Sequence, residues 1–130
     1  MRLARYTAVD DYGVLVNPMI AAGQAHGAIA QGIGQALLDH AVIGNGFRSA
    51  DGRLVDGLCF AARRRPPVVQ SRVQRRCTTN PLGVKGCGEA GAVGAFPAIA
   101  NAISDALAPV GVTDLAGPAT PERIRRVIRA

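Results

Sequence analysis

Two long stretches of small and apolar residues dominate the chain and predict its main helices. The first covers residues 19–39 and contains no proline. Its apolar residues recur at helical spacing, most clearly Ile29, Ile33, Ala36 and Leu37. Each of its glycines costs roughly 0.5–1 kcal/mol relative to alanine in a helix. Such a helix needs tertiary packing, and its glycine faces would let backbone or a ligand come close.

The second stretch predicts a helix over residues 92–107. Pro97 lies near its start, where a first turn tolerates proline. A short third helix is predicted at the C-terminal end of the sequence, because Thr120 can cap it and Pro121 suits its first position. One face of this helix would carry Ile124, Val127 and Ile128.

Shorter patterns predict β-structure before the first helix and between the first and second. Residues 2–18 alternate loosely and indicate a strand, a turn at Asp11-Tyr12-Gly13 and a second short strand ending at Asn17-Pro18. Residues 40–57 indicate a hairpin, with turns at Asn45-Gly46 and Asp51-Gly52. The predicted fold is α+β: short strands or a hairpin packed on two glycine- and alanine-rich helices, with a short C-terminal helix.

The net charge of +6 comes from one segment. Residues 61–77 hold six arginines and no acidic residue, so the rest of the chain is neutral. We interpret this segment as an unstructured arginine-rich loop. A small basic module that binds nucleic acid or a partner chain is the alternative, although no aromatic residue interrupts the arginines.

Length and composition indicate one domain in residues 1–130 that can bury a core. No run reaches the ~18 uninterrupted apolar residues of a membrane span. The first residues are basic without an apolar stretch, which is unlike a secretory signal and favours the cytoplasm. The spacing of the three cysteines, Cys59, Cys77 and Cys87, suits neither a metal site nor a disulfide framework.

Glu89 is the sharpest candidate for chemistry, since it stands alone among glycine and alanine just before a predicted helix. In dry surroundings its carboxylate could act as a general base; capping of the helix is the structural alternative. Gln24 could present an amide to a flat polar ligand, or bond its own backbone neighbours. Lys85 could place a cation near an anionic cofactor, or be a solvated turn residue.

Two segments resemble the C-terminal part of the large subunit of molybdenum hydroxylases, the family of xanthine dehydrogenase, aldehyde oxidase and aerobic carbon monoxide dehydrogenase. They are "AVDDYGVLVNPMIAAGQAHGAIAQGIGQALLD" and "NPLGVKGCGEAGAVGAFPAIANAISDAL". The resemblance implies that Glu89 is the catalytic base and that Gln24 touches the molybdopterin. It also implies that the loop of Lys85, Gly86, Cys87 and Gly88 lies beside the same cofactor.

The resemblance further implies partners that the chain does not contain. These are the remainder of the large subunit, which carries the residues that select the substrate, and iron–sulfur and FAD subunits or domains. The reaction implied is hydroxylation of an aldehyde, an N-heterocycle or a similar carbon centre. No membrane is implied. We expect a fragment without turnover of its own and with apolar surface exposed.

Residues 55–77 depart from the family, which has there a segment resembling "MDYALPRADDLPSF". Codons allowed for "DGLCFAARRRPPVV" (56–69) yield that segment when read one base later. We therefore hypothesise that about residues 55–77 are translated out of frame. The arginines, Cys59 and Cys77 would then have no function.

Overall fold

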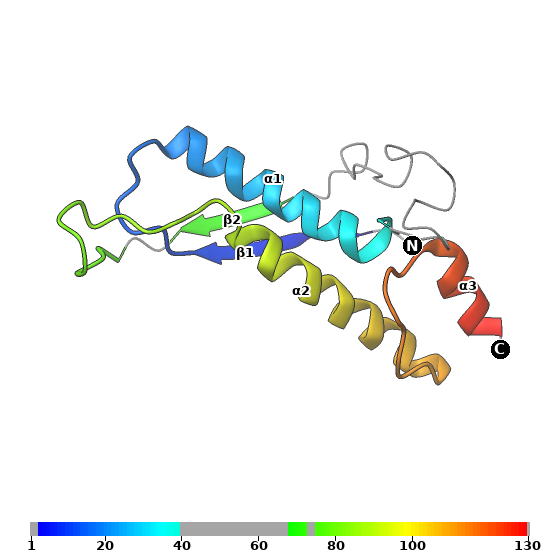
Figure 1. Cartoon of the computed structure of the whole chain (residues 1–130). Helices are drawn as coiled ribbons and strands as arrows, with labels where there is room; N and C mark the ends of the chain where they lie inside the picture. Colours follow the sequence, from blue (N-terminus) through cyan, green and yellow to red (C-terminus); the bar gives the residue numbers. More distant parts are fainter. Residues whose placement is uncertain (1–2, 40–67, 73–74, 130) are drawn as a thin grey trace, which may run out of the picture.

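The computed structural model describes residues 3–39, 68–72 and 75–129. In chain order the elements are β1 (Tyr6–Asp10), α1 (Pro18–Leu37), β2 (Val68–Arg72), α2 (Ala90–Leu107), η2 (Ala108–Val110) and α3 (Pro121–Arg129). In Figure 1, α1 runs along the strand pair, α2 lies next to α1, and α3 sits at the far end. This is the predicted α+β arrangement of two main helices, short strands and a C-terminal helix.

The start of α1 follows from two adjacent residues. The Asn17 side chain accepts hydrogen bonds from the backbone N–H groups of Met19 and Ile20, each at 3.1 Å. Pro18 occupies the first helical position, where its missing N–H costs nothing. The helix therefore begins one residue earlier than predicted.

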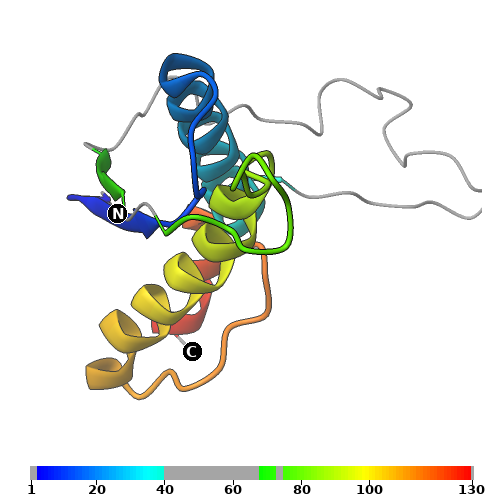
Figure 2. The ribbon, with the colours of Figure 1, turned by 90° about the vertical axis from the view of Figure 1, so that its left-hand side faces the viewer.

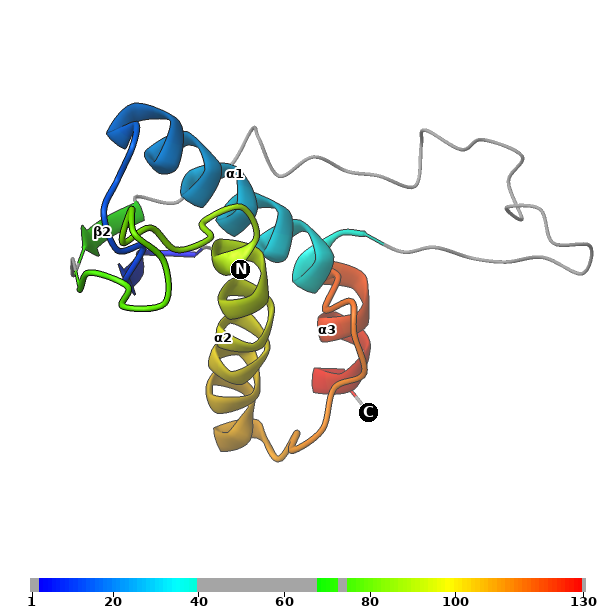
Figure 3. The ribbon, with the colours of Figure 1, turned by 60° about the vertical axis from the view of Figure 1, so that its left-hand side comes forward.

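The core lies between α1 and α2 and confirms the predicted apolar face, because Ile29, Ile33 and Ala36 are all buried. Figure 3 shows the two helices packed near α2's start and separating toward its end. The buried cluster comprises Ile29, Ile33, Ala36, Ala95, Ile99, Ile103, Leu107 and Ala119.

Two glycines allow this close packing. A Cβ at Gly32 would lie 2.8 Å from the Cβ of Ala95 and 2.9 Å from the carbonyl oxygen of Ala92. A Cβ at Gly91 would lie 2.7 Å from the carbonyl oxygen of Ala25. Gly32 of α1 thus lies against the backbone of α2, and Gly91 of α2 lies against the backbone of α1. This is the close approach of backbones that the glycines of the sequence predicted.

The strands differ from the prediction in two ways. β1 pairs in parallel with β2, and the register runs from Tyr6 with Val68 to Asp10 with Arg72. The two arrows point the same way in Figure 1, and Figure 2 shows the strand pair to one side of the helices. The unstructured loop predicted for 61–77 is therefore wrong at Val68–Arg72. The predicted second strand before Pro18 is also wrong, because Gly13 turns the chain at φ +63° and the next backbone pairs with another loop. The hairpin predicted over 40–57 lies outside the described residues.

α2 begins at Ala90, two residues before the predicted start, so Pro97 lies inside the helix and not in its first turn. The proline lacks the N–H that would bond to the Val93 carbonyl. Both residues are exposed, so water can satisfy that carbonyl. α3 begins as predicted, with the Arg123 N–H donating to the Thr120 Oγ1 at 3.2 Å. On its apolar face Ile124 packs against the core, while Ile128 stays 51% exposed.

Much apolar surface is exposed, as expected of a fragment. Val16, Met19 and Val93 are each at least 74% exposed. The segment Ala90–Val110 is long and apolar enough to cross a membrane, with a mean hydropathy of 1.3. Length and composition alone are weak support for a span, and here one face of α2 forms the core with α1.

Gly32→Ala should destabilise the chain by about 1–3 kcal/mol, because the added methyl group would overlap the backbone of α2. Gly23→Ala is the matched control, since a Cβ there meets nothing within 4 Å. It should stabilise α1 by up to about 1 kcal/mol. Urea unfolding of both variants measures the difference, and equal stabilities would contradict the packing described.

Candidate functional site

A groove of about 340 Å³ lies between α1 and the start of α2. This volume is in the range of small-molecule sites. Its lining is mostly small or amide-bearing, apart from one carboxylate and one valine. The residues are Gln24, Gly27, Ala28, Gln31, Gln35, Gly88, Glu89, Ala92 and Val93.

Three glutamines of α1 line this groove. Gln24, Gln31 and Gln35 are spaced by seven and four residues, so a 3.6-residue period places them on one stripe of the helix. All three are exposed. Gln24 was predicted from the sequence and Gln31 and Gln35 were not, although their spacing from Gln24 places them on the same side of the helix.

Glu89 occupies the N-cap position of α2 and lines the groove opposite these amides. Its backbone carbonyl oxygen accepts hydrogen bonds from the N–H groups of Ala92 and Val93, at 3.0 and 3.2 Å. Its side chain makes no capping hydrogen bond, so the capping alternative is wrong. The carboxylate is exposed in this chain and free to meet a ligand in the groove.

The glycines of the groove have a different role from those between the helices. A Cβ at Gly27 or at Gly88 would meet nothing within 4 Å. Their missing side chains therefore leave open space and do not serve helix contact. A ligand could approach the backbone closely at both positions.

The other predicted site residues lie next to the groove in sequence without lining it. The Lys85 ammonium forms an ion pair with the Asp11 carboxylate, N to O 2.5 Å. Cys87 is a half-buried free thiol, and Gly86 is exposed. The structure thus brings together Gln24, Gly88 and Glu89, and leaves Lys85, Gly86 and Cys87 outside the lining.

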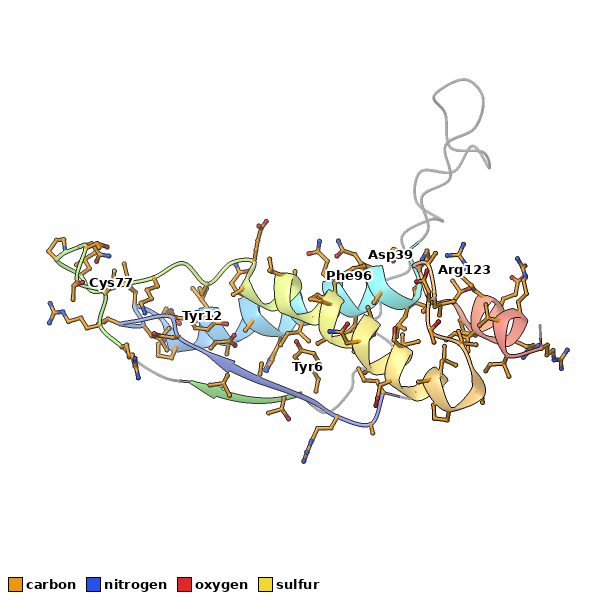
Figure 4. The ribbon with its side chains drawn as sticks, turned by 90° about the horizontal axis from the view of Figure 1, so that it is seen from below. Tyr6, Tyr12, Asp39, Cys77, Phe96 and Arg123 are labelled. Carbon is orange, nitrogen blue, oxygen red and sulfur yellow. The ribbon has the colours of Figure 1, made fainter. Side chains whose placement is uncertain are left out.

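The loop that leads to Glu89 is held by the loop between β1 and α1. Both lie at one end of the molecule in Figures 1 and 3, where Figure 4 labels Tyr12 and Cys77. The Val14 N–H donates to the Gly83 carbonyl at 2.9 Å, and the Lys85 N–H donates to the Tyr12 carbonyl at 3.0 Å. A Cβ at Gly13 would lie 2.4 Å from the Gly83 carbonyl oxygen, so this contact requires glycine.

Two groups near this end titrate away from their ordinary range. The hydrogen bond from Lys85, followed by those from the Gly13 and Arg75 N–H groups, lowers the pKa of Asp11 to about 2. Hydrogen bonds from Thr79 lower the pKa of the Cys77 thiol. Among the residues that the structure describes, no group of three His, Cys, Asp or Glu side chains could hold a metal ion.

Comparison with known proteins places this geometry in a family. A family model described as a molybdopterin cofactor-binding domain matches residues 1–57. The nicotine 6-hydroxylase large subunit of Paenarthrobacter nicotinovorans is 32% identical over 99% of the chain. The structure superposes on quinoline 2-oxidoreductase from Pseudomonas putida 86 with a TM-score of 0.88, at 36% identity over 98% of the chain. The chain is similar to part of the large subunit of molybdenum hydroxylases.

A second solved structure agrees with this assignment. The Cu,Mo-CO dehydrogenase matches 97% of the chain with a TM-score of 0.86 and 26% identity. The chain spans only 16% of the length of each of these three proteins. It is therefore a partial molybdopterin-binding domain, and the nucleic-acid alternative is not favoured.

The groove suits part of a molybdopterin site. Amides donate and accept hydrogen bonds, which matches the polar edge of a flat heterocycle. The open space at Gly27 and Gly88 admits such a ring against the backbone. Gln24, Gln31 and Gln35 lie within the segment that the family model matches, while Glu89 lies beyond it.

The lowered pKa of Asp11 predicts how the stability of this chain depends on pH. Its pKa is lowered from the ordinary 3.8 to about 2, so its contribution is present above pH 3.8 and lost as the pH falls toward 2. The melting temperature of Asp11→Asn should therefore lie below that of the wild type at pH 5, and the gap should close near pH 2. A gap of constant size across this range would contradict the assignment.

Proposed function

We propose that this chain supplies the catalytic base and part of the cofactor site of a molybdenum hydroxylase-type oxidoreductase. The observation that carries the proposal is that Glu89 shares one groove with Gln24. These residues come from helices separated by more than sixty positions in the sequence. A base can act beside a bound cofactor only if the fold brings it next to the residues that bind the cofactor, and this groove does so for Glu89 and Gln24.

Glu89 would accept the proton that is released when a carbon centre is hydroxylated. Its carboxylate has no capping bond to break, and the backbone of α2 holds its position. The molybdopterin, when bound, supplies the metal and takes up the electrons. Glu89 is exposed here, so the remainder of the large subunit would have to exclude water and keep the carboxylate basic.

Gln24 would orient the cofactor by hydrogen bonds from its amide, with Gln31 and Gln35 continuing the same polar stripe. The loop from Lys85 to Gly88 would lie beside the cofactor, with its glycines leaving room at the backbone. Two different tasks thus fall to the two sides of the groove: α1 binds and orients, and the start of α2 moves a proton.

The chain spans 16% of its relatives, so the proposed enzyme needs further protein that this chain does not contain. The chain would pack against the remainder of the large subunit, which would cover the apolar side chains now exposed. Iron–sulfur and FAD subunits would carry electrons away. We propose a cytoplasmic enzyme whose substrate is an aldehyde, an N-heterocycle or a similar carbon centre. The fragment alone would have no turnover.

A hybrid enzyme tests the proposed base. Residues 1–39 and 78–130 would replace the matching segments of quinoline 2-oxidoreductase, with the host's own sequence kept between them. The hybrid should bind molybdenum and turn over quinoline. Glu89→Gln in the hybrid should keep the molybdenum and lose at least about 10²-fold in kcat, because a positioned base contributes that much.

Glu122→Gln is the matched control, since Glu122 lies on α3 in an exposed pair with Arg126. It should leave kcat unchanged. Full turnover in the Glu89→Gln hybrid would refute the role of Glu89 as base. A hybrid that folds without molybdenum would refute the cofactor site.

Residues 55–77 carry a separate proposal, that they are translated out of frame. The presence of β2 in this segment is compatible with it, because strand pairing uses backbone groups that every residue except proline offers. Sequencing the coding DNA should reveal a single-base shift near Val55 and a second near Thr78. An unbroken frame, with no shift that restores "MDYALPRADDLPSF", would refute the proposal.

A further inference from the structure

We propose that Asp11 and Lys85 form a latch that positions the loop carrying Glu89. The latch is the ion pair between the Asp11 carboxylate and the Lys85 ammonium. The inference rests on the proposed function, because it assigns Lys85 a positioning role toward the base in place of direct contact with the cofactor.

Asp11 joins three segments of the chain through one carboxylate. Its Oδ1 accepts hydrogen bonds from the backbone N–H groups of Gly13, at 3.0 Å, and Arg75, at 3.1 Å. Its Oδ2 accepts a hydrogen bond from the Lys85 Nζ at 2.5 Å. The first bond shapes the turn after β1, the second ties in the chain that follows β2, and the third reaches the loop before α2.

Within the part of the chain that the structure describes, the loop has few other attachments between Lys85 and Glu89. A Cβ at Gly86 or Gly88 would meet nothing within 4 Å, so neither glycine packs closely against another part of the chain. The path of these residues is therefore set mainly by its two ends. One end is Lys85, with its backbone bond to Tyr12 and its ion pair; the other is Gly91, pressed against α1.

Lys85 itself does not line the groove, and its ammonium is directed to Asp11. A lysine that bound the cofactor would be expected to face the groove that Glu89 lines. Asp11 and Lys85 are partly exposed, at 29% and 36% for their side chains, so the latch is a modest interaction that biases the loop.

Cys87 offers a probe of the loop that needs no cofactor. It lies between the two open glycines and is a free thiol. In the full chain with Cys59→Ser and Cys77→Ser, the rate of alkylation of Cys87 by iodoacetamide, an uncharged reagent, measures how often the loop opens. Asp11→Asn and Lys85→Gln should each raise this rate about two- to fivefold, the range expected for a partly exposed ion pair.

A double-mutant cycle separates the latch from two independent effects. The Asp11→Asn, Lys85→Gln double variant should react no faster than either single variant. The conservative Lys85→Arg, which keeps the positive charge opposite Asp11, should stay near the wild-type rate. Arg126→Gln, which breaks the ion pair with Glu122 in α3, should have no effect.

Rates that multiply in the double variant, or a Lys85→Arg variant as reactive as Lys85→Gln, would overturn the latch. Far-UV circular dichroism of each variant confirms that the helices are intact, and Lys85→Arg keeps the test decisive if a charge-removing variant unfolds. The result is independent of catalysis. An inactive wild-type hybrid enzyme with the expected labelling pattern would overturn the proposed function alone.

Discussion

The contact between α1 and α2 is the interaction on which the rest of this structure depends. Gly32 and Gly91 each face the other helix at distances that exclude a side chain. Because a methyl group at either position would collide with backbone, no rotamer change could relieve it. The same contact that builds the core also brings the N-terminal end of α2 onto α1, and Glu89 lies two residues before Gly91.

The glycines around Glu89 therefore divide into three physical groups. Gly32 and Gly91 serve close helix packing, and Gly13 and Gly83 take positive φ where two loops meet. Gly27 and Gly88 leave empty space along the groove. Of these three groups only the last borders the groove. A glycine-rich motif by itself therefore overstates how much of a chain can touch a ligand.

The proposed function gives the exposed apolar surface and the exposed carboxylate one explanation. The chain spans 16% of the length of its relatives, and the rest of the proposed large subunit would cover both. The outer face of α2, with Val93 at 74% and Phe96 at 43% exposure, is apolar enough that Ala90–Val110 resembles a membrane span. A helix whose apolar residues would be buried on several sides exposes apolar side chains when only one of its sides is packed.

The sequence alone determined the elements whose signals are local. Helical spacing of Ile29 and Ile33 placed α1, and Thr120-Pro121 placed the start of α3, since periodicity and capping act within a few residues. The motif around Glu89 carried the resemblance to the family. Gln24 was also singled out from the sequence, and it lines the groove. Pro97 misled the prediction of where α2 begins, because interior prolines are costly unless the freed carbonyl reaches water.

Tertiary structure decided whatever depended on distant partners. The pairing of β1 with β2 joins residues about sixty positions apart, and no local pattern encodes a parallel partner. The contact of Lys85 with Asp11, and the absence of Lys85 from the groove lining, likewise emerged only when two loops met. Hydrophobic patterning specifies which face of an element is buried, but the path of the chain between elements specifies which polar groups meet.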